Sequence, residues 1–157
     1  MRVYKITTRH SQLRDVDTPH KIFLYMGWAE EFRDANNDST RRVFILPKSW
    51  AGKHLKLTVH FNGDVNGGGN DIYFKGTISA GSDNEYWDNH TDDSGNSLIT
   101  EAHSTAYITK IISHTFTGYT IDTNDQICLD FERLGNDALD TYTGSVYVMA
   151  LIIEAVD

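Results

Sequence analysis

The sequence has a single cysteine, Cys128, among its 157 residues. One cysteine excludes an intrachain disulfide and a cysteine-based metal site, so the fold must depend on an apolar core. No apolar run approaches the 18 residues of a membrane-spanning helix, and the first residues lack the apolar segment of a signal peptide. We therefore expect one globular domain that is synthesised in a cytoplasm and does not insert into a membrane.

Basic residues are scarce relative to acidic ones. The formal net charge is −8, which argues against a nucleic-acid partner. Residues 1–53 have ten Lys and Arg against six Asp and Glu, a net charge of +4, whereas residues 54–157 have four against sixteen, a net charge of −12. This asymmetry predicts that a basic front docks onto an acidic partner. Ordinary scatter of surface charge is an equally good explanation.

The sequence also lacks amphipathic helices of convincing length. Alternation of apolar and polar residues recurs instead, most clearly in residues 54–61 and again in 72–78 and 126–133. Turns rich in Gly, Asn and Asp separate seven or eight such segments, among them a strand expected at residues 105–116, and a polar loop is expected at residues 30–40. The pattern predicts an all-β sandwich or barrel that extends over residues 22–157.

The last predicted strand, residues 144–156, is apolar on both faces. An undisturbed period of two places Val146, Val148, Ala150 and Ile152 on one face, and the other face then has Tyr147, Met149, Leu151 and Ile153. A strand that is apolar on both faces must be covered on both. One cover is the core of the domain, and the other is a loop or a neighbouring subunit. We predict that the second set forms a partner interface, with residues 22–29 as a second doubly covered strand.

Residues 1–21 form a separate segment without a sustained period. Their apolar residues are too few for an independent core, so ordering them costs conformational entropy unless a partner supplies contacts. We predict an N-terminal arm whose basic side chains face acidic groups of a partner. The alternative is that residues 3–7 form an edge strand of the sandwich. The basic residues of the predicted interface are Arg2, Lys5, Arg9, Arg14 and Lys21.

Two polar loops imitate calcium sites. The first has Asp34, Asn36 and Asp38, and the second has Asn62, Asp64 and Asn66, both with the alternating spacing of an EF-hand loop. The twelfth position, which requires a bidentate Glu, is Ile45 in one and Tyr73 in the other. Asx turns are the simpler explanation. The seven histidines show no ligand spacing either, so we predict no metal and no other cofactor.

No catalytic pattern is present. The sequence has no Gly-x-Ser-x-Gly motif, no phosphate-binding loop and no evident nucleophile with its base, which predicts that the protein is not an enzyme. Two aromatic sites are candidates for ligand binding. We expect Trp50 to be buried under its turn. Tyr86 and Trp87, inside a long acidic loop at residues 79–97, are the better candidates for ligand contact.

Three segments resemble structural proteins of tailed bacteriophages: residues 46–53, 125–133 and 140–148. The resemblance extends over roughly residues 41–156 and leaves out the first twenty. It implies a jelly-roll-like antiparallel β-sandwich without catalytic residues, and the N-terminal arm predicted above for residues 1–21 would be added to it. Proteins of this kind are capsid decoration (cement) proteins or tail-fibre domains, and they are often trimeric.

The function expected from this resemblance is that of a cement protein on the outer surface of the virion. It would stabilise the shell by non-covalent contacts with the major capsid protein and with copies of itself in a homotrimer. Two alternatives stay open. One is a tail-fibre or receptor-binding domain that contacts host glycans, and the other is a free-standing carbohydrate-binding module or sandwich enzyme. A cement protein would bind shells and ignore glycans, whereas a glycan-binding module would do the reverse.

Overall fold

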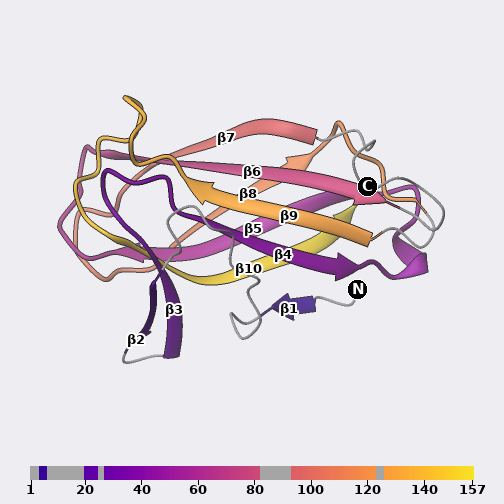
Figure 1. Cartoon of the computed structure of the whole chain (residues 1–157), viewed down its shortest axis with the longest axis horizontal. Helices are drawn as coiled ribbons and strands as arrows, with labels where there is room; N and C mark the ends of the chain where they lie inside the picture. The colour runs from indigo at the N-terminus through magenta and orange to yellow at the C-terminus, as the bar shows by residue number, and fades with distance from the viewer. Residues whose placement is uncertain (1–3, 7–19, 25–26, 82–92, 123–125) are drawn as a thin grey trace.

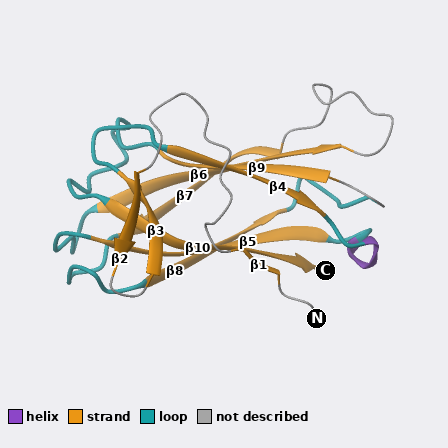
Figure 2. Ribbon diagram, turned by 60° about the horizontal axis from the view of Figure 1, so that its bottom comes forward, coloured by secondary structure: helices purple, strands orange, loops and turns teal. Residues whose placement is uncertain are grey.

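The computed structural model describes residues 4–6, 20–24, 27–81, 93–122 and 126–157. Two antiparallel sheets pack face to face (Figure 2). The six-stranded sheet has the order β2 (His20–Leu24), β3 (Gly27–Phe32), β10 (Val146–Val156), β5 (His54–Gly63) and β8 (Lys110–Phe116), with β1 (Tyr4–Ile6) also paired to β10. The four-stranded sheet has the order β4 (Ser39–Ile45), β9 (Gln126–Arg133), β6 (Asp71–Gly81) and β7 (Asp93–Glu101). The predicted all-β, jelly-roll-like sandwich is confirmed.

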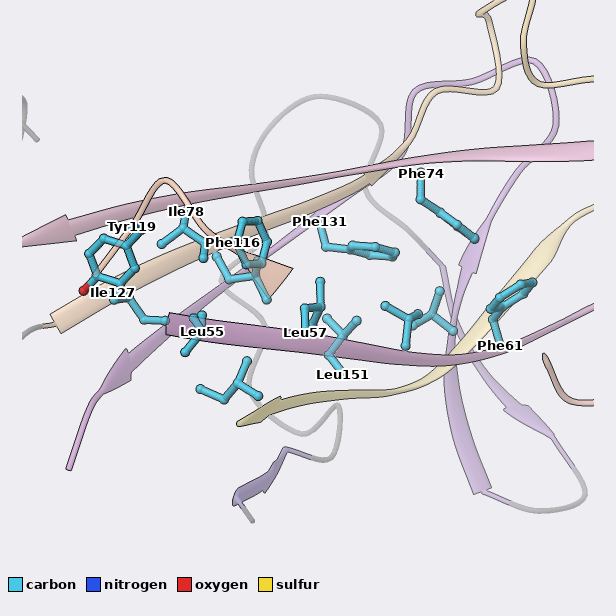
Figure 3. Packing of buried hydrophobic residues seen from close by; sticks show 14 of the residues in the cluster. Leu55, Leu57, Phe61, Phe74, Ile78, Phe116, Tyr119, Ile127, Phe131 and Leu151 are labelled. Carbon is cyan, nitrogen blue, oxygen red and sulfur yellow. The ribbon is translucent and has the colours of Figure 1, made fainter. Parts of the chain in front are cut away.

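The core lies between the two sheets and follows the predicted alternation. In β5, Leu55, Leu57, Val59 and Phe61 are buried, and the residues between them lie on the outer face. Figure 3 shows Leu57 and Phe61 on the side of β5 that faces Phe131 and Phe74 of the opposite sheet. The ring centroids of Phe74 and Phe131 are 5.1 Å apart. The only regular helix in the described part of the chain is the 3₁₀ turn η1 (Lys48–Trp50). Trp50 is buried under this turn, as predicted.

In the second half of strand β10, the side chains face the opposite way from the prediction. Val146 and Val148 lie in the core, but the register with β5 shifts between Val148 and Ala150. This bulge adds one residue, so the core positions after it are Leu151 and Ile153. The prediction that these two residues share a face with Tyr147 and Met149 is therefore wrong, because it assumed an undisturbed period of two. An interface role for Tyr147 and Met149 stays a prediction.

The C-terminal strands β9 and β10 both exist, but they lie in different sheets. The chain crosses between the sheets through residues 134–145, and a buried ion pair fastens this crossing. Arg133 is fully buried and donates from Nε and Nη2 to the two carboxylate oxygens of Asp140, over 2.8 and 2.7 Å. Its Nη1 donates to the Gly144 carbonyl over 2.6 Å. The crossing is thus bonded to the core rather than free at the surface.

The N-terminal part differs from the prediction in two ways. Strand β1 pairs antiparallel with residues 151–153 of β10, so the edge-strand alternative describes this segment. The predicted single strand over residues 22–29 belongs to two antiparallel strands, β2 and β3, which project from the sandwich as a hairpin (Figure 1). The backbones of Lys5 and Lys21 lie in β1 and β2, respectively. Arg2, Arg9 and Arg14 lie outside the described residues.

Two predicted loops are shorter than expected. The polar loop predicted over residues 30–40 begins after β3, which continues to Phe32, and ends at β4. The acidic loop predicted over residues 79–97 is shortened at both ends, because β6 runs to Gly81 and β7 begins at Asp93. Among the described residues, no helix has the length and apolar character needed to cross a membrane.

Candidate functional site

Two tyrosines, one exposed and one half-buried, form an aromatic surface on the outer face of the six-stranded sheet. Tyr107 is 60% exposed, and it is the aromatic member of the exposed large apolar side chains in the described part of the chain. Its ring is nearly parallel to that of Tyr147, at an interplanar angle of 6° and a centroid distance of 6.5 Å. We call Tyr107 and Tyr147 the tyrosine platform.

Tyr147 is positioned by the sheet itself. It precedes the bulge in β10, between Glu31 of β3 and Asn62 of β5 in the strand register. Because its neighbours Val146 and Val148 point into the core, the Tyr147 ring points to the outer face. Register partners on one face have Cβ atoms about 4.5–5.5 Å apart, so Glu31 and Asn62 border the ring on both sides.

Tyr107 is positioned by two loops that hydrogen-bond each other at one end of the sandwich (Figure 2). Its backbone N–H donates to the Gly63 carbonyl over 2.8 Å. The N–H of the preceding Ala106 donates to Asn66 Oδ1 over 2.9 Å. A third bond runs from the Gly67 N–H to the His103 carbonyl, over 3.1 Å. The segment between β7 and β8 is thereby held against the turn after β5.

The backbone of Tyr107 is strained, with φ at +60°. A positive φ places Cβ against the backbone and costs a bulky residue about 1–3 kcal/mol, so it persists only where the surrounding contacts impose it. The hydrogen bonds of the two loops supply those contacts. Residues held in this way concentrate at binding and catalytic sites.

Tyr142 lies buried beneath the platform and explains why the turn is rich in glycine. Its hydroxyl donates to the Val65 carbonyl and accepts from the Val65 N–H, both over 2.9 Å. A Cβ added at Gly63 would lie 2.1 Å from the Tyr142 hydroxyl, and one added at Gly67 would lie 2.6 Å from its ring. Glycine is required at these two positions for close approach. At Gly69, where φ is +85°, it is required for backbone conformation.

The surroundings of the platform are acidic. Burial raises the pKa of Tyr147 to about 12, and the nearby charges of Asp64 and Glu31 add to the shift. The pKa of Tyr142 is also raised, first by burial and then by Asp64, against the lowering effect of its bond from Val65. Glu31 Oε1 accepts a hydrogen bond from Ser145 Oγ over 2.8 Å, which orients the carboxylate.

Two buried acceptors lie beside the platform. Asn62 is 7% exposed, and its Nδ2 contacts Met149 Sδ at 3.7 Å. No group among the described residues donates to Asn62 Oδ1 or to Asp64 Oδ1, and both atoms are buried. A buried acceptor without a donor costs about 1–3 kcal/mol, so a donor that reached either atom would gain free energy. Both atoms are closed to solvent, so a ligand would reach them only after a neighbouring side chain shifts.

No family model matches the sequence, and neither does any curated protein. Solved structures share the fold. The CBM22-1 xylan-binding domain from Paenibacillus barcinonensis Xyn10C aligns over 96% of this chain and 88% of its own, with a TM-score of 0.54 and 12% identity. The xylan-binding module CBM15 aligns over 99% and 97%, with a TM-score of 0.54 and 10% identity.

A third structure contains the same fold as part of a larger protein. It holds the CBM22-1 and GH10 modules of the endo-1,4-β-D-xylanase Xyn10B from Clostridium thermocellum, complexed with xylohexaose. This chain aligns over 99% of its own length and 28% of that one, with a TM-score of 0.56 and 13% identity. At identities this low, the likeness shows a common β-sandwich fold.

The two predicted calcium loops have different arrangements. Asp38 is fully buried, and its carboxylate accepts from the backbone N–H and the guanidinium of Arg33, over 2.6 and 2.8 Å. Asp34 lies 3.8 Å from the Arg133 guanidinium. These carboxylates are therefore neutralised by arginines. Across the described ranges, no three His, Cys, Asp or Glu side chains come together as a metal site. That the protein needs no metal stays a prediction.

The second predicted loop belongs to the platform. Asn62 borders Tyr147, and Asn66 accepts a hydrogen bond from the segment that presents Tyr107. The charge of Asp64 contributes to the raised pKa values of Tyr142 and Tyr147. The structure therefore brings together Asn62, Asp64, Asn66, Tyr147 and Met149, which the sequence assigned to two unrelated sites. Tyr86 and Trp87, the predicted ligand loop, lie outside the described residues.

Sequence reasoning missed Tyr107, because it placed this residue inside a predicted strand at residues 105–116. Strand β8 begins only at Lys110. A signal was present, since the adjacent Tyr107 and Ile108 interrupt the alternation expected of a strand, and both are exposed.

Proposed function

We propose that this chain is a non-catalytic carbohydrate-binding sandwich that holds a sugar on the tyrosine platform. The observation that carries the proposal is a parallel pair of rings: the exposed Tyr107, presented by a strained and hydrogen-bonded loop, and the half-buried Tyr147 on β10. A pyranose has an apolar face of C–H groups and a polar rim of hydroxyls. The apolar face fits an exposed aromatic ring, and the rim requires polar partners beside it.

The polar partners lie at the edge of the platform. Asn62 Oδ1 and Asp64 Oδ1 are buried acceptors without a donor among the described residues, and a side-chain shift that opened them would let sugar hydroxyls supply donors. Tyrosine has few rotatable bonds, so little side-chain entropy is lost when a ligand binds. The strain and hydrogen bonds at Tyr107 hold its ring in place before the ligand arrives.

The fold supports the same proposal. Two of the structures that share this sandwich are described as xylan-binding modules, and this chain aligns over most of the length of each. Fold alone does not determine function, so the local geometry of the platform must carry the argument. Binding without cleavage is part of the proposal, because the platform is open to water, whereas catalysis favours sites that exclude it.

The test is a binding screen on soluble neutral polysaccharides, including xylan, galactan and β-glucan, by affinity electrophoresis followed by titration calorimetry. Tyr107→Asn replaces the exposed ring by a side chain that tolerates a positive φ, and Tyr147→Ala removes the other ring. Each loss should weaken binding by about 2- to 13-fold, since an aromatic contact contributes roughly 0.5–1.5 kcal/mol.

Tyr73→Ala serves as the matched control, because Tyr73 is a half-buried tyrosine on the outer face of the other sheet. It should bind like the unmodified protein, and no preparation should release reducing sugar. Absence of saturable binding to every polysaccharide would refute the proposal. So would binding that both platform variants retain in full.

Capsid decoration stays a prediction that rests on the sequence resemblance. The same holds for the major capsid protein as partner, for the homotrimer and for the location on the virion. A receptor-binding domain of a phage tail would use a glycan site of the kind proposed here. Binding of empty shells in the absence of glycan affinity would favour the cement protein instead.

A further inference from the structure

We infer that the tyrosine platform selects neutral glycans and discriminates against glycans that carry carboxylates, because Glu31 and Asp64 border the site with fixed negative charge. This inference rests on the proposed function and adds the chemical class of the ligand.

The first acidic group is held beside Tyr147 by the sheet. Glu31 is the register partner of Tyr147 on β3, on the same outer face. Register partners on one face are nearest neighbours across the strands. The hydrogen bond from Ser145 Oγ to Glu31 Oε1, over 2.8 Å, orients the carboxylate. A sugar stacked on Tyr147 would therefore meet this group along one edge.

The second acidic group is held by close packing in the turn after β5. The Asp64 N–H donates to the Ser145 carbonyl over 3.1 Å. Its Oδ1 packs against Gly144, since a Cβ added to that glycine would lie 2.3 Å from the oxygen. The carboxylate is thus fixed near the opposite edge of Tyr147 from Glu31, since Asp64 follows Asn62, the register partner of Tyr147 on β5.

Hydrogen-bond chemistry adds to the effect of charge. Asn62 Oδ1 and Asp64 Oδ1 are acceptors, and no described group donates to them. A sugar hydroxyl has a proton to donate to such an atom. An ionised sugar carboxylate has only acceptor oxygens, so that group cannot donate to either atom and would be repelled by the charges.

The net charge of the whole chain is also negative. Its formal net charge is −8, and residues 54–157, which include most of the site, account for −12 against +4 in residues 1–53. A field of this sign lowers the local concentration of anionic ligands. The discrimination should therefore be strongest at low ionic strength and decrease as salt is added.

The test uses one neutral hexose oligosaccharide that the protein binds and the same oligosaccharide after oxidation of its primary hydroxyls to carboxylates. Affinity is measured by calorimetry at about 20 mM and about 500 mM salt, where screening lengths differ severalfold. At low salt the oxidised ligand should bind roughly fivefold weaker or more, the factor expected for two unit charges in solvent at contact distance. At high salt the difference in affinity between the neutral and the oxidised ligand should be smaller.

Two variants locate the effect. Asp64→Asn and Glu31→Gln should each raise the affinity for the oxidised ligand relative to the neutral one. Glu132→Gln is the matched control, since Glu132 lies on the outer face of the opposite sheet, 3.4 Å from Lys75, and should leave the ratio unchanged. Equal affinity for the two ligands would refute the inference and leave the proposed function intact. Failure to bind either ligand would refute both.

Discussion

The buried ion pair that fastens the crossing between the sheets allows a quantitative test. Arg133 and Asp140 have fully buried side chains, and the guanidinium makes two bonds to the carboxylate. In Asp140→Asn the guanidinium would remain buried without its counter-charge. Breaking a buried pair by removing one partner costs about 3–5 kcal/mol. Asp34, 3.8 Å from the Arg133 guanidinium and partly exposed, offers some compensation, so we expect a loss near the lower limit.

This loss corresponds to a measurable change in melting temperature. For a domain of this size, each kcal/mol lowers the melting temperature by about 2–4 °C, so Asp140→Asn should melt about 6–12 °C lower. Denaturant unfolding followed by circular dichroism gives the free energy directly. Combining this variant with Arg133→Met in a double-mutant cycle should show a coupling of about 0.5–3 kcal/mol, since the two side chains are in contact.

The control is the ion pair between Arg41 and Asp130 on the outer face of the four-stranded sheet, where both side chains are about 30% exposed. Exposed pairs contribute about 0–1 kcal/mol, so Asp130→Asn should melt within a few degrees of the unmodified protein. If Asp140→Asn is no more destabilising than Asp130→Asn, the buried pair is not what fastens the crossing.

Two further predictions follow from the site. The folded protein raises the pKa of Tyr147 from 10.0 to about 12, so the neutral phenol stabilises the fold below pH 10, and this contribution is lost as the pH rises from 10 to 12. Tyr147→Phe should show a smaller loss of stability over that range, and an identical pH profile would contradict the assignment. Gly63→Ala would place a Cβ 2.1 Å from the Tyr142 hydroxyl and should cost about 1–3 kcal/mol in denaturant unfolding. Gly68→Ala, whose nearest contact would be Ser104 Cβ at 3.2 Å, should cost less, and equal losses would refute the role of Tyr142.

Regular strands could be predicted from the sequence because a period of two requires no long-range information. Strands β5, β6 and β9 show alternating burial over most of their length. In β9 the phase of Ile127, Leu129 and Phe131 continues inward to Arg133, and this placed a charged residue in the core. The inward position of Arg133 could therefore be read from the sequence. Its partner Asp140 could not, because Asp140 lies in an irregular segment whose path depends on the packing of both sheets.

The hairpin of β2 and β3 and the residue Tyr107 show the opposite case. Residues 22–29 are apolar almost throughout, and no Asn-Gly or Asp-Gly turn divides them, so alternation could not indicate two strands. The position of Tyr107 depends on hydrogen bonds that its own N–H donates to Gly63 and the Ala106 N–H donates to Asn66, about forty residues away in the chain. Contacts of this separation are a product of the fold. The local pattern shows only that the alternation breaks at Tyr107 and Ile108, and it does not show which segment holds the loop.

The bulge in β10 connects the fold to the proposed site. A strand apolar on both faces suggested a second covering surface, and a subunit interface was the natural candidate. The bulge removes much of that requirement, because it changes which residues face the core along the strand. Val146 and Val148 face the core before the bulge, and Leu151 and Ile153 face it after the bulge. Tyr147 lies just before the transfer and remains on the outer face beside Asn62. The half-buried apolar side chains left on the outer face of the strand are Tyr147, Met149, Ile152 and Val156, and the proposed sugar site would use Tyr147 alone among them.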